Sequence, residues 1–207
     1  TGMGQKRLYR SSNPIDPGLG RNLYADSLAK NAGVTTFINL SDSEEYARSC
    51  QSFDSSYYST QNVIFLDLPV YFYSQHFKDG IASGFRYMIE HDGPYLVHCT
   101  FGMDRTGFTI AVLEALMGAT TEDIQADYAK TFSNYFNVVD SMHVALNEQQ
   151  VDFFRAVVIR NLKTVYHAEG IEIPDTGTID WAEPTEKYLE KLGMTQEEIS
   201  ALKDRLK

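Results

Sequence analysis

A cysteine and an arginine six positions apart are the residues of this chain best suited to chemistry. Residues 95–107 read Tyr-Leu-Val-His-Cys-Thr-Phe-Gly-Met-Asp-Arg-Thr-Gly, with Cys99 at the end of an apolar run and Arg105 at the start of a helical pattern. A thiolate is a strong nucleophile, and a guanidinium offers a planar fork that matches two oxygens of a phosphate. The pair therefore predicts attack by sulfur on a bound phosphate ester.

The residues between and beside this pair fit the same chemistry. A loop at a helix N-terminus directs backbone N–H groups and the positive end of the helix dipole toward an anion. Gly102 permits a tight turn, Thr106 can donate a hydrogen bond to the sulfur, and His98 can fix the loop through its ring nitrogens. The candidate catalytic residues are Cys99, Arg105, Asp104 and Asp67, and the candidate substrate-binding residues are His98, Thr100, Phe101, Gly102, Met103 and Thr106.

Two aspartates compete to protonate the leaving group, a role typically worth ~10²–10⁴ in rate. Asp104 directly precedes Arg105, so it lies within reach of any ester that the arginine holds. Asp67 ends a predicted strand and would have to be carried in by residues 68–74. Each also has a plainer explanation, Asp104 as a carboxylate that orients the arginine and Asp67 as a turn residue. We expect Asp104 to be the donor.

Strands and helices in alternation must position this loop. β-branched and aromatic runs predict strands over residues 7–12, 34–40, 63–70 and 95–98. Helical spacing predicts helices over residues 20–32, 44–48, 75–91 and 105–117, then from residue 120, and over 141–167, 184–192 and 195–206. This order predicts an α/β fold with a central, mostly parallel sheet flanked by helices and a helical C-terminal part. We expect residues 1–207 to form a single domain, in which 170–207 can be a C-terminal helical extension.

Composition narrows the range of partners. The 207 residues include 28 acidic and 18 basic side chains, for a net charge of −10. An acidic chain of this kind argues against a nucleic acid or an anionic membrane as partner. No stretch approaches the ~18 apolar residues of a membrane-spanning helix, and no signal peptide is present. The chain begins Thr1-Gly2-Met3-Gly4, which does not resemble a native start, so its localisation is left open.

The cysteine and histidine pattern predicts neither a metal nor a cofactor. Cys50 and Cys99 form no C-x-x-C pair and no Cys/His zinc pattern. We expect Cys50 to be a partly buried thiol, with a protective disulfide to an oxidised Cys99 as the alternative. The remaining histidines outside the loop show no metal-ligand spacing and are expected at the surface or satisfied in the core: His76, His91, His143 and His167.

Several other side chains are weaker candidates for the rim of the pocket. Arg10 lies in the first predicted strand, and Asp42 and Arg48 follow the second. The tyrosines at positions 57, 58, 71 and 73 can shape a substrate cleft, although packing in the core or in loops is the plainer expectation.

The segment His98-Cys99-x5-Arg105-Thr106 resembles the signature of the protein tyrosine phosphatase superfamily. Its ending, Gly-x-Asp-Arg-Thr-Gly, resembles a bacterial atypical group that includes secreted mycobacterial tyrosine and lipid phosphatases, and both ends of the chain resemble that group as well. The resemblance implies a phosphotyrosine phosphatase-like fold. It also implies a bacterial protein that is either cytoplasmic or exported. It also implies hydrolysis of phosphate monoesters through a phosphocysteine, with phosphotyrosine or dual specificity. The spacing of Asp67 resembles that of the acid in dual-specificity phosphatases.

Two loop residues depart from that group. Met103 stands where relatives usually carry lysine, and Phe101 where the residue is often small or polar. The loop therefore lacks an extra cation, which weakens the case for highly phosphorylated inositides. Phe101 can supply an apolar wall or pack against the protein itself.

Three other functions stay open from the sequence. They are a phosphoinositide or inositol-phosphate phosphatase, a catalytically inactive module that binds phosphorylated ligands, and a sulfur transferase of the rhodanese kind. The spacing of Arg105 from Cys99, with Thr-Gly following, fits a phosphatase better than a sulfur transferase. The expected partner is a phosphorylated protein or a lipid or inositol phosphate, and the oligomeric state is not predicted.

Overall fold

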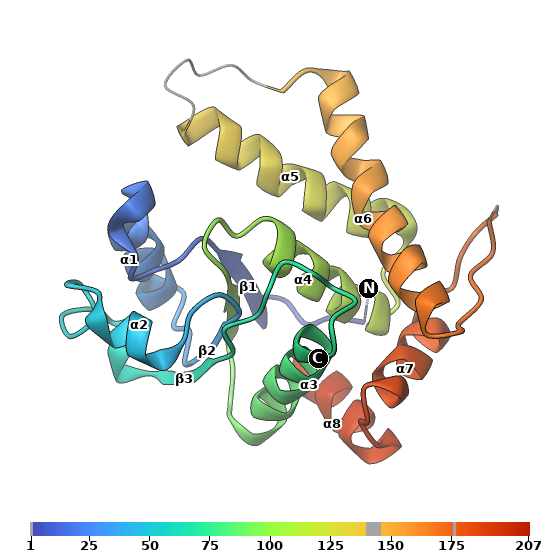
Figure 1. Cartoon of the computed structure of the whole chain (residues 1–207), viewed down its shortest axis with the longest axis horizontal. Coiled ribbons are helices and arrows are strands. Elements are labelled where there is room, and N and C mark those ends of the chain that lie inside the picture. The colour runs from blue at the N-terminus through green and yellow to red at the C-terminus, as the bar shows by residue number, and fades with distance from the viewer. Residues whose placement is uncertain (1, 140–145, 176) are drawn as a thin grey trace.

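Strands and helices alternate in the first half of the chain, and helices alone follow (Figure 1). The computed structural model describes residues 2–139, 146–175 and 177–207. The first half contains β1 (Leu8–Ser11), α1 (Asn22–Asn31), β2 (Thr36–Asn39), α2 (Glu44–Ser49), β3 (Asn62–Phe65), α3 (Gln75–Glu90) and β4 (Tyr95–His98). The second half contains α4 (Asp104–Leu116), α5 (Thr121–Val139), α6 (Glu148–Ala168), α7 (Ala182–Lys191) and α8 (Gln196–Leu206).

The strands form one sheet in which every pairing is parallel. Across the described part of the chain the strand order is β1-β4-β2-β3. β4 therefore lies inside the sheet, with Tyr95 opposite Leu8 on one side and opposite Thr36 on the other. The carboxyl ends of parallel strands are where such folds bind ligands, and β4 delivers Cys99 to that edge. The predicted α/β fold, with a mostly parallel sheet flanked by helices, is confirmed.

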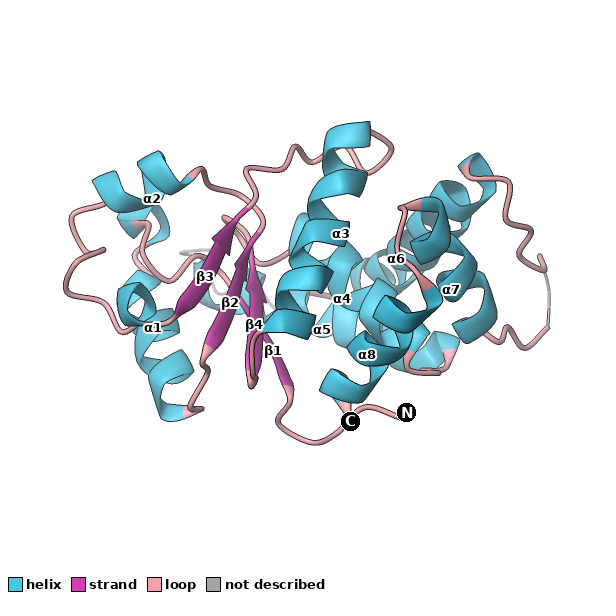
Figure 2. Ribbon diagram, turned by 90° about the horizontal axis from the view of Figure 1, so that it is seen from below, coloured by secondary structure: helices cyan, strands magenta, loops and turns pink. Residues whose placement is uncertain are grey.

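The two faces of the sheet carry separate hydrophobic clusters. Alternate side chains of a strand point to opposite faces. Leu96 packs with Phe37 in the cluster that lies against α1 and α2, whereas Tyr95 and Val97 belong to the larger cluster with α3 and α4. Figure 2 shows α1 and α2 on one side of the sheet and the remaining helices on the other.

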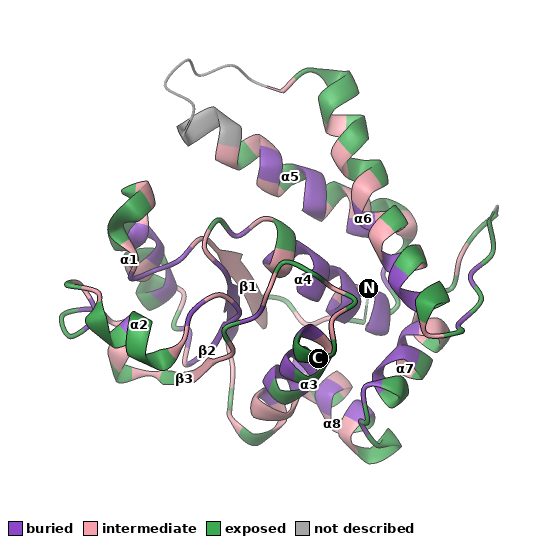
Figure 3. Cartoon of the chain, in the orientation of Figure 1, coloured by how far each residue is buried: buried purple, intermediate pink, exposed green. Residues whose placement is uncertain are grey.

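α4 is the central helix of the larger cluster. Its residues Thr106 to Leu113 are all buried, and so are Ala115 and Leu116 (Figure 3). A helix that is apolar on every side must be surrounded by protein. Gly107 allows α5 to approach closely, because a Cβ there would lie 2.4 Å from the Tyr128 ring. The helix that begins beside Cys99 is thus fixed on all sides by packing.

The C-terminal helices share this core. Trp181, Tyr188 and Leu206 are fully buried in the same cluster as α4. The two chain ends meet where the Gly4 amide donates to the Leu206 carbonyl at 2.7 Å. Among the helices that the structure describes, none has both the length and the apolar character required to span a bilayer.

Two predicted elements differ from the observed ones. The strand predicted over 63–70 ends at Phe65, although Leu68 still donates its N–H to the Leu40 carbonyl at 2.9 Å. Asp67, with φ of 46°, adopts a left-handed conformation that interrupts the extended backbone. The helix predicted over 141–167 begins at Glu148, after a capping box formed by Asn147 and Gln150, and residues 141–145 lie outside the described part.

Candidate active site

The cysteine loop, residues 99–104, connects β4 to α4. Cys99 is 3% exposed at the base of the loop, and Asp104 and Arg105 are the first two residues of α4. Gly102 has φ of 72°, and a Cβ at this position would lie 2.5 Å from the Ser11 carbonyl oxygen. The turn therefore needs glycine both for its left-handed backbone and for its close approach to the segment after β1.

Arg105 connects the loop to the segment that follows β3. Its Nη1 donates to the Leu68 carbonyl at 2.8 Å, and its Nη2 donates to Thr100 Oγ1 at 3.1 Å. A guanidinium has five N–H donors, so these two bonds orient the group and leave other donors for a ligand. The arginine is held in place before any substrate binds.

The outer side of the loop is anchored through its carbonyl groups. The backbone N–H of Asn13 donates to the Thr100 carbonyl at 3.2 Å, and Arg10 Nη2 donates to the Gly102 carbonyl at 3.2 Å. Arg10 is itself fixed by an ion pair with Asp127 of α5. Because the C=O and the next N–H of a planar trans peptide point in opposite directions, these bonds turn the following amides away from β1. The amides of residues 101 and 103 are thereby directed toward the inside of the loop.

A buried polar network lies behind the loop. His98 Nε2 lies 3.1 Å from the Tyr58 hydroxyl, which also accepts a bond from Asn39 Nδ2 at 3.1 Å. Both Asn39 and Asn13 donate to the Asp42 carboxylate, at 3.0 and 2.7 Å. Since Tyr58 accepts from Asn39, its own proton can go to His98 Nε2, an arrangement in which the imidazole proton is on Nδ1.

The environment keeps His98 neutral. Burial lowers the pKa of His98 to about 4, although the charge of Asp42 acts in the opposite direction. Burial also raises the pKa of Tyr58 well above its ordinary value. At neutral pH the network therefore contains an uncharged ring and an un-ionised phenol, joined through Asn39 to the Asp42 carboxylate.

The two candidate acids both lie near Arg105. Asp104 is exposed at the start of α4. The pKa of Tyr128 is raised mainly by burial, and the charges of Asp104 and Cys99 raise it further. Asp67 is also exposed, and the next residue, Leu68, gives its carbonyl to Arg105. The structure thus brings both aspartates to the two chain segments that the guanidinium joins.

Comparison with known proteins places this arrangement in a family. The model of the tyrosine phosphatase family matches residues 3–207. This chain belongs to the tyrosine phosphatase family. No curated protein matches the chain. A similar solved structure is the core catalytic domain of the PP-IP phosphatase SIW14 from S. cerevisiae in complex with citrate, with 15% identity to this phosphatase and a TM-score of 0.42 over 79% of this chain and 89% of that chain.

Some sequence candidates for the rim lie elsewhere in this phosphatase. Asp42 and Tyr58 are buried in the network behind the cysteine loop and do not face a cleft. Arg48 is exposed and pairs with Glu44 of its own helix. The sequence made Asp42 and Arg48 weak candidates for the rim, and the structure gives Asp42 another role, because its carboxylate accepts hydrogen bonds from the side-chain amides of Asn13 and Asn39.

Three exposed aromatic side chains belong either to the cysteine loop or to the chain that follows Leu68. Tyr71 and Tyr73 follow the Leu68 segment and pack on one another at 5.4 Å between ring centres. Phe101 is 39% exposed and meets Tyr135 of α5 edge-on at 5.9 Å. Phe101 therefore combines the two expectations for it, since it packs against α5 and still presents part of its ring to solvent.

Sequence reasoning missed the residues that position the loop from a distance. The Leu68 carbonyl, the Asn13 amide and the Asp127 carboxylate all act through contacts between segments far apart in the chain. A backbone carbonyl leaves no mark in a sequence, so Leu68 had no signal. Asn13 had a weak one, because Asn followed by Pro after a strand is typical of a turn.

The remaining cysteine and histidines take local roles. Cys50 is half-buried in the cluster beside α1 and α2, whereas Cys99 belongs to the cluster on the other face of the sheet. His91 Nδ1 lies 3.0 Å from the Tyr87 carbonyl, and His167 Nε2 accepts from the Ile173 amide at 3.4 Å. His76 is exposed, and His143 lies outside the described residues.

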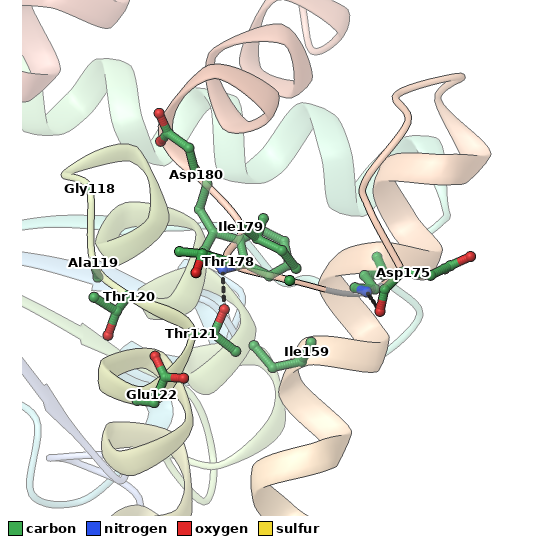
Figure 4. A pocket seen from close by; sticks show the side chains of 13 residues that line it. Gly118, Ala119, Thr120, Thr121, Glu122, Ile159, Asp175, Thr178, Ile179 and Asp180 are labelled. Atoms are coloured by element: carbon green, nitrogen blue, oxygen red, sulfur yellow. Dashed lines mark hydrogen bonds between the residues drawn. The ribbon is translucent and has the colours of Figure 1, made fainter.

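The molecule also has a large cavity away from the cysteine loop. It has a volume of about 540 Å³ and lies between the start of α5, α6 and residues 177–181 (Figure 4). Trp181 forms part of its wall and donates a hydrogen bond to Thr121 Oγ1 at 2.9 Å. Neither Cys99 nor Arg105 is among its lining residues, so size alone does not identify the reactive site.

Proposed function

We propose that this protein is a cysteine-dependent phosphatase that hydrolyses phosphate monoesters, of the phosphotyrosine or dual-specificity type, through a phosphocysteine intermediate. The supporting observation is the pre-oriented Arg105 guanidinium, fixed by the Leu68 carbonyl and Thr100, on the loop that holds Cys99 at its base. An anion over the loop meets inward-directed amides, the N-terminus of α4 and the remaining Arg105 donors.

The first step transfers the phosphoryl group to sulfur. The Cys99 thiolate attacks phosphorus, so that an S–P bond forms as the bond from phosphorus to the ester oxygen breaks. Asp104 gives a proton to the departing oxygen, and the alcohol or phenol leaves. The charge of the transferred group is stabilised by Arg105 and the loop amides, which are fixed before the reaction begins.

The second step regenerates the thiolate. The Asp104 carboxylate takes a proton from water, the water oxygen attacks phosphorus, and the S–P bond breaks to release phosphate. Thr106 is fully buried at the first turn of α4, and its hydroxyl has no hydrogen-bond partner among the described residues. This hydroxyl is the group that would donate to the sulfur as negative charge returns to it.

The charges around the loop favour a substrate with few phosphates. Met103 brings no cation to the loop, and Arg10 is paired with Asp127. Arg105 is the cation of the loop itself, which suits one phosphoryl group better than a ring that carries many. The alternative is a phosphoinositide or inositol-phosphate phosphatase, and hydrolysis rates on both classes of substrate decide between the two.

The experiment that tests the proposal compares Cys99→Ser with Cys50→Ser, which removes the other thiol of the chain. Wild-type protein and Cys50→Ser should hydrolyse p-nitrophenyl phosphate and a phosphotyrosine peptide, and Cys99→Ser should show no turnover because a hydroxyl is a far weaker nucleophile. Cys99→Ser should still bind the peptide through Arg105 and the amides. Full activity in Cys99→Ser would overturn the phosphocysteine mechanism, and binding without turnover in the wild type would indicate a binding module. Faster hydrolysis of a phosphoinositide panel would support the alternative substrate class.

A further inference from the structure

The Leu68 segment, residues 66–72, runs from the end of β3 past the guanidinium of Arg105. Its backbone stays attached to the sheet, because the Leu68 N–H donates to the Leu40 carbonyl at 2.9 Å. The carbonyl of the same residue accepts from Arg105 Nη1 at 2.8 Å. Pro69 follows, and a residue before proline is restricted to extended backbone conformations. The direction of the Leu68 carbonyl therefore depends on how the whole residue is held.

Two glycines of α3 form the surface on which the Leu68 segment lies. Gly80 and Gly84 are four residues apart, so they occupy the same face of the helix, and both are buried. A Cβ at Gly80 would overlap Leu68 Cδ2 and would lie 3.2 Å from Leu68 Cγ and Cδ1. A Cβ at Gly84 would instead lie 3.2 Å from Leu66 Cδ1 and 3.1 Å from Ile38 Cγ2. The Leu68 side chain thus occupies the volume that a larger residue at position 80 would need.

The backbone of α3 does not itself require a glycine at position 80. Gly80 lies in the interior of the helix with ordinary helical geometry. Alanine forms such a helix more readily, because glycine loses more backbone entropy on folding. The feature that needs glycine here is the close approach of Leu68 to α3.

The Leu68 side chain is enclosed on its other sides. It is 3% exposed and belongs to the same hydrophobic cluster as Phe77 of α3. Four residues later, Phe72 stacks on Phe108 of α4 with 4.5 Å between ring centres. The Leu68 segment is thereby fixed to α3 at one point and to α4, the helix that carries Arg105, at another. In a close-packed interior, a displaced side chain moves the backbone that carries it.

We infer that Gly80 is a positioning residue for phosphoryl transfer. Because it has no side chain, Leu68 lies close to α3, and this keeps the Leu68 carbonyl within hydrogen-bond reach of Arg105 Nη1. The inference rests on the proposed function and adds to it a residue that lies outside the cysteine loop. If the carbonyl moved away, the guanidinium would lose one of the two hydrogen bonds that orient it and would keep the bond to Thr100 Oγ1. The bidentate grip on the transferred phosphoryl group depends on that orientation.

The first test measures kcat and KM on p-nitrophenyl phosphate for Gly80→Ala, at a temperature where circular dichroism shows the variant to be fully folded. We expect kcat/KM to fall by about 10²-fold, mostly through kcat, as a small misplacement of a catalytic group can produce. Gly84→Ala is the matched control, since it adds the same methyl group to the same face of α3 but against Leu66 and Ile38. Its activity should stay near that of the wild type.

A double-mutant cycle tests whether Gly80 acts through Arg105. Arg105→Lys removes the planar fork, so Gly80→Ala should cost much less in the Arg105→Lys background than in the wild type. A purely structural role of Gly80 predicts the same loss of activity in both backgrounds. Adding Leu68→Ala to Gly80→Ala removes the three nearest atoms that the new Cβ would meet and keeps the main-chain carbonyl. This double variant should therefore be more active than Gly80→Ala alone.

Unchanged kcat/KM in folded Gly80→Ala overturns the inference, as does an equal loss in Gly84→Ala or in both backgrounds of the cycle. If Gly80→Ala does not fold, Leu68→Val replaces it, because a shorter side chain holds the segment less firmly against α3. It should give a smaller loss with the same dependence on Arg105, and wild-type activity would overturn the inference. If the wild type turns over no substrate, the proposed function fails, and the Kd for inorganic phosphate then tests Gly80 alone. Weaker binding in Gly80→Ala but not in Gly84→Ala supports the inference, and equal Kd values overturn it.

Discussion

Arg105 binds two segments that lie far apart in the sequence, and each of them carries a candidate acid. Its guanidinium touches the Leu68 carbonyl, next to Asp67, while Asp104 precedes it directly in α4. Asp67 has a left-handed backbone with φ of 46°, a conformation that is uncommon for a residue other than glycine, asparagine or aspartate. The left-handed backbone of Asp67 sets the direction in which the chain enters Leu68, and this structural role alone explains an aspartate at position 67. Asp104 has no comparable role in the backbone conformation.

We therefore predict that Asp104→Asn impairs protonation of the leaving group. The variant should slow alkyl phosphates by about 10²–10⁴ and aryl phosphates much less, because phenolates leave more easily without a proton. It should also lose the basic limb of the pH–rate profile. The measurement is kcat/KM as a function of pH on one aryl and one alkyl phosphate. Asp67→Asn is the matched control and should behave nearly as wild type; if it loses the limb while Asp104→Asn keeps it, the acid is Asp67.

Tyr58 allows a second test at the scale of single residues. Its hydroxyl connects Asn39 to His98, and its ring packs edge-on against Phe37 with 4.8 Å between ring centres. Tyr58→Phe keeps the ring and removes the hydroxyl, so His98 Nε2 and one Asn39 proton lose their partner. We expect a loss of roughly 1–3 kcal/mol in the free energy of unfolding, the usual cost of buried groups left unpaired. Urea denaturation measures this loss.

The same variant distinguishes positioning from mere stability. Without the Tyr58 hydroxyl, the imidazole of His98 is free to take the other tautomer, which would disturb the start of the cysteine loop. We expect kcat to fall at temperatures where Tyr58→Phe is still fully folded, with little change in KM. A variant that is destabilised yet has wild-type kcat would show that the network contributes to the core only.

At the scale of elements, the cysteine loop depends on its contact with the segment after β1. Gly102 packs against Ser11, and Arg10 and Asn13 bind the loop carbonyls. Gly102→Ala should therefore abolish most activity, because a Cβ would lie 2.5 Å from the Ser11 oxygen and the backbone must hold φ of 72°. The strain of the left-handed backbone alone costs an alanine about 1–2 kcal/mol. Activity assays and urea denaturation measure the two effects.

Gly118 provides the matched control for that substitution. Its φ is 73°, almost the value at Gly102, but a Cβ there would have no atom within 4 Å. Gly118→Ala therefore carries the same backbone strain without a collision, and it should lose stability while keeping its activity. Equal activity in Gly102→Ala and Gly118→Ala would show that the close approach to Ser11 is not required.

The sequence predicted the elements well and their contacts poorly. β-branched and aromatic runs predicted β2 and β4, and helical spacing of apolar residues predicted α3, because each pattern reports one local geometry. The end of β3 was wrong because Asp67 turns the backbone while the apolar run continues through Leu68. The roles of Leu68, Asn13 and Asp127 arise only when distant segments meet, and residue types alone do not carry that information. Cys99 and Arg105 were recognisable because both lie within one short segment.

Across the whole molecule, the C-terminal helices complete the packing around α4. α7 and α8 place Tyr188, Leu202 and Leu206 in the same cluster as the helix that begins at the cysteine loop. α8 is further tied to α3 by the ion pair of Arg86 with Glu198. Such shared packing is what we expect if residues 170–207 extend the same domain, since a separate unit would have a core of its own.

The pH dependence of stability gives a prediction for the molecule as a whole. Glu114 lies on α4, where burial raises its pKa from an ordinary 4.5 to about 9, with Asp127 and Asp123 of α5 acting in the same direction and Arg10 opposing them. Between these two values the folded chain holds a proton that the unfolded chain has released. The free energy of unfolding therefore falls as pH rises through this window, by at most about 1.4 kcal/mol per pH unit. His98 acts the other way and at lower pH, because its pKa is lowered to about 4 by burial, so its contribution is lost as pH falls below about 6.5.

Glu114→Gln should remove the first of these effects. A glutamine cannot ionise, so the variant should gain stability relative to wild type as pH rises from about 4.5 to 9, and the gain should level off above pH 9. The range from pH 7 to 9 is the clearest part of this window, because His98 no longer titrates there in either state. Urea denaturation at intervals of one pH unit measures this difference. Glu122→Gln, at an exposed position of α5, is the matched control and should follow the wild-type curve. Parallel curves for wild type and Glu114→Gln across pH 7–9 would mean that Glu114 is already ionised in the folded protein at neutral pH, which would overturn the prediction.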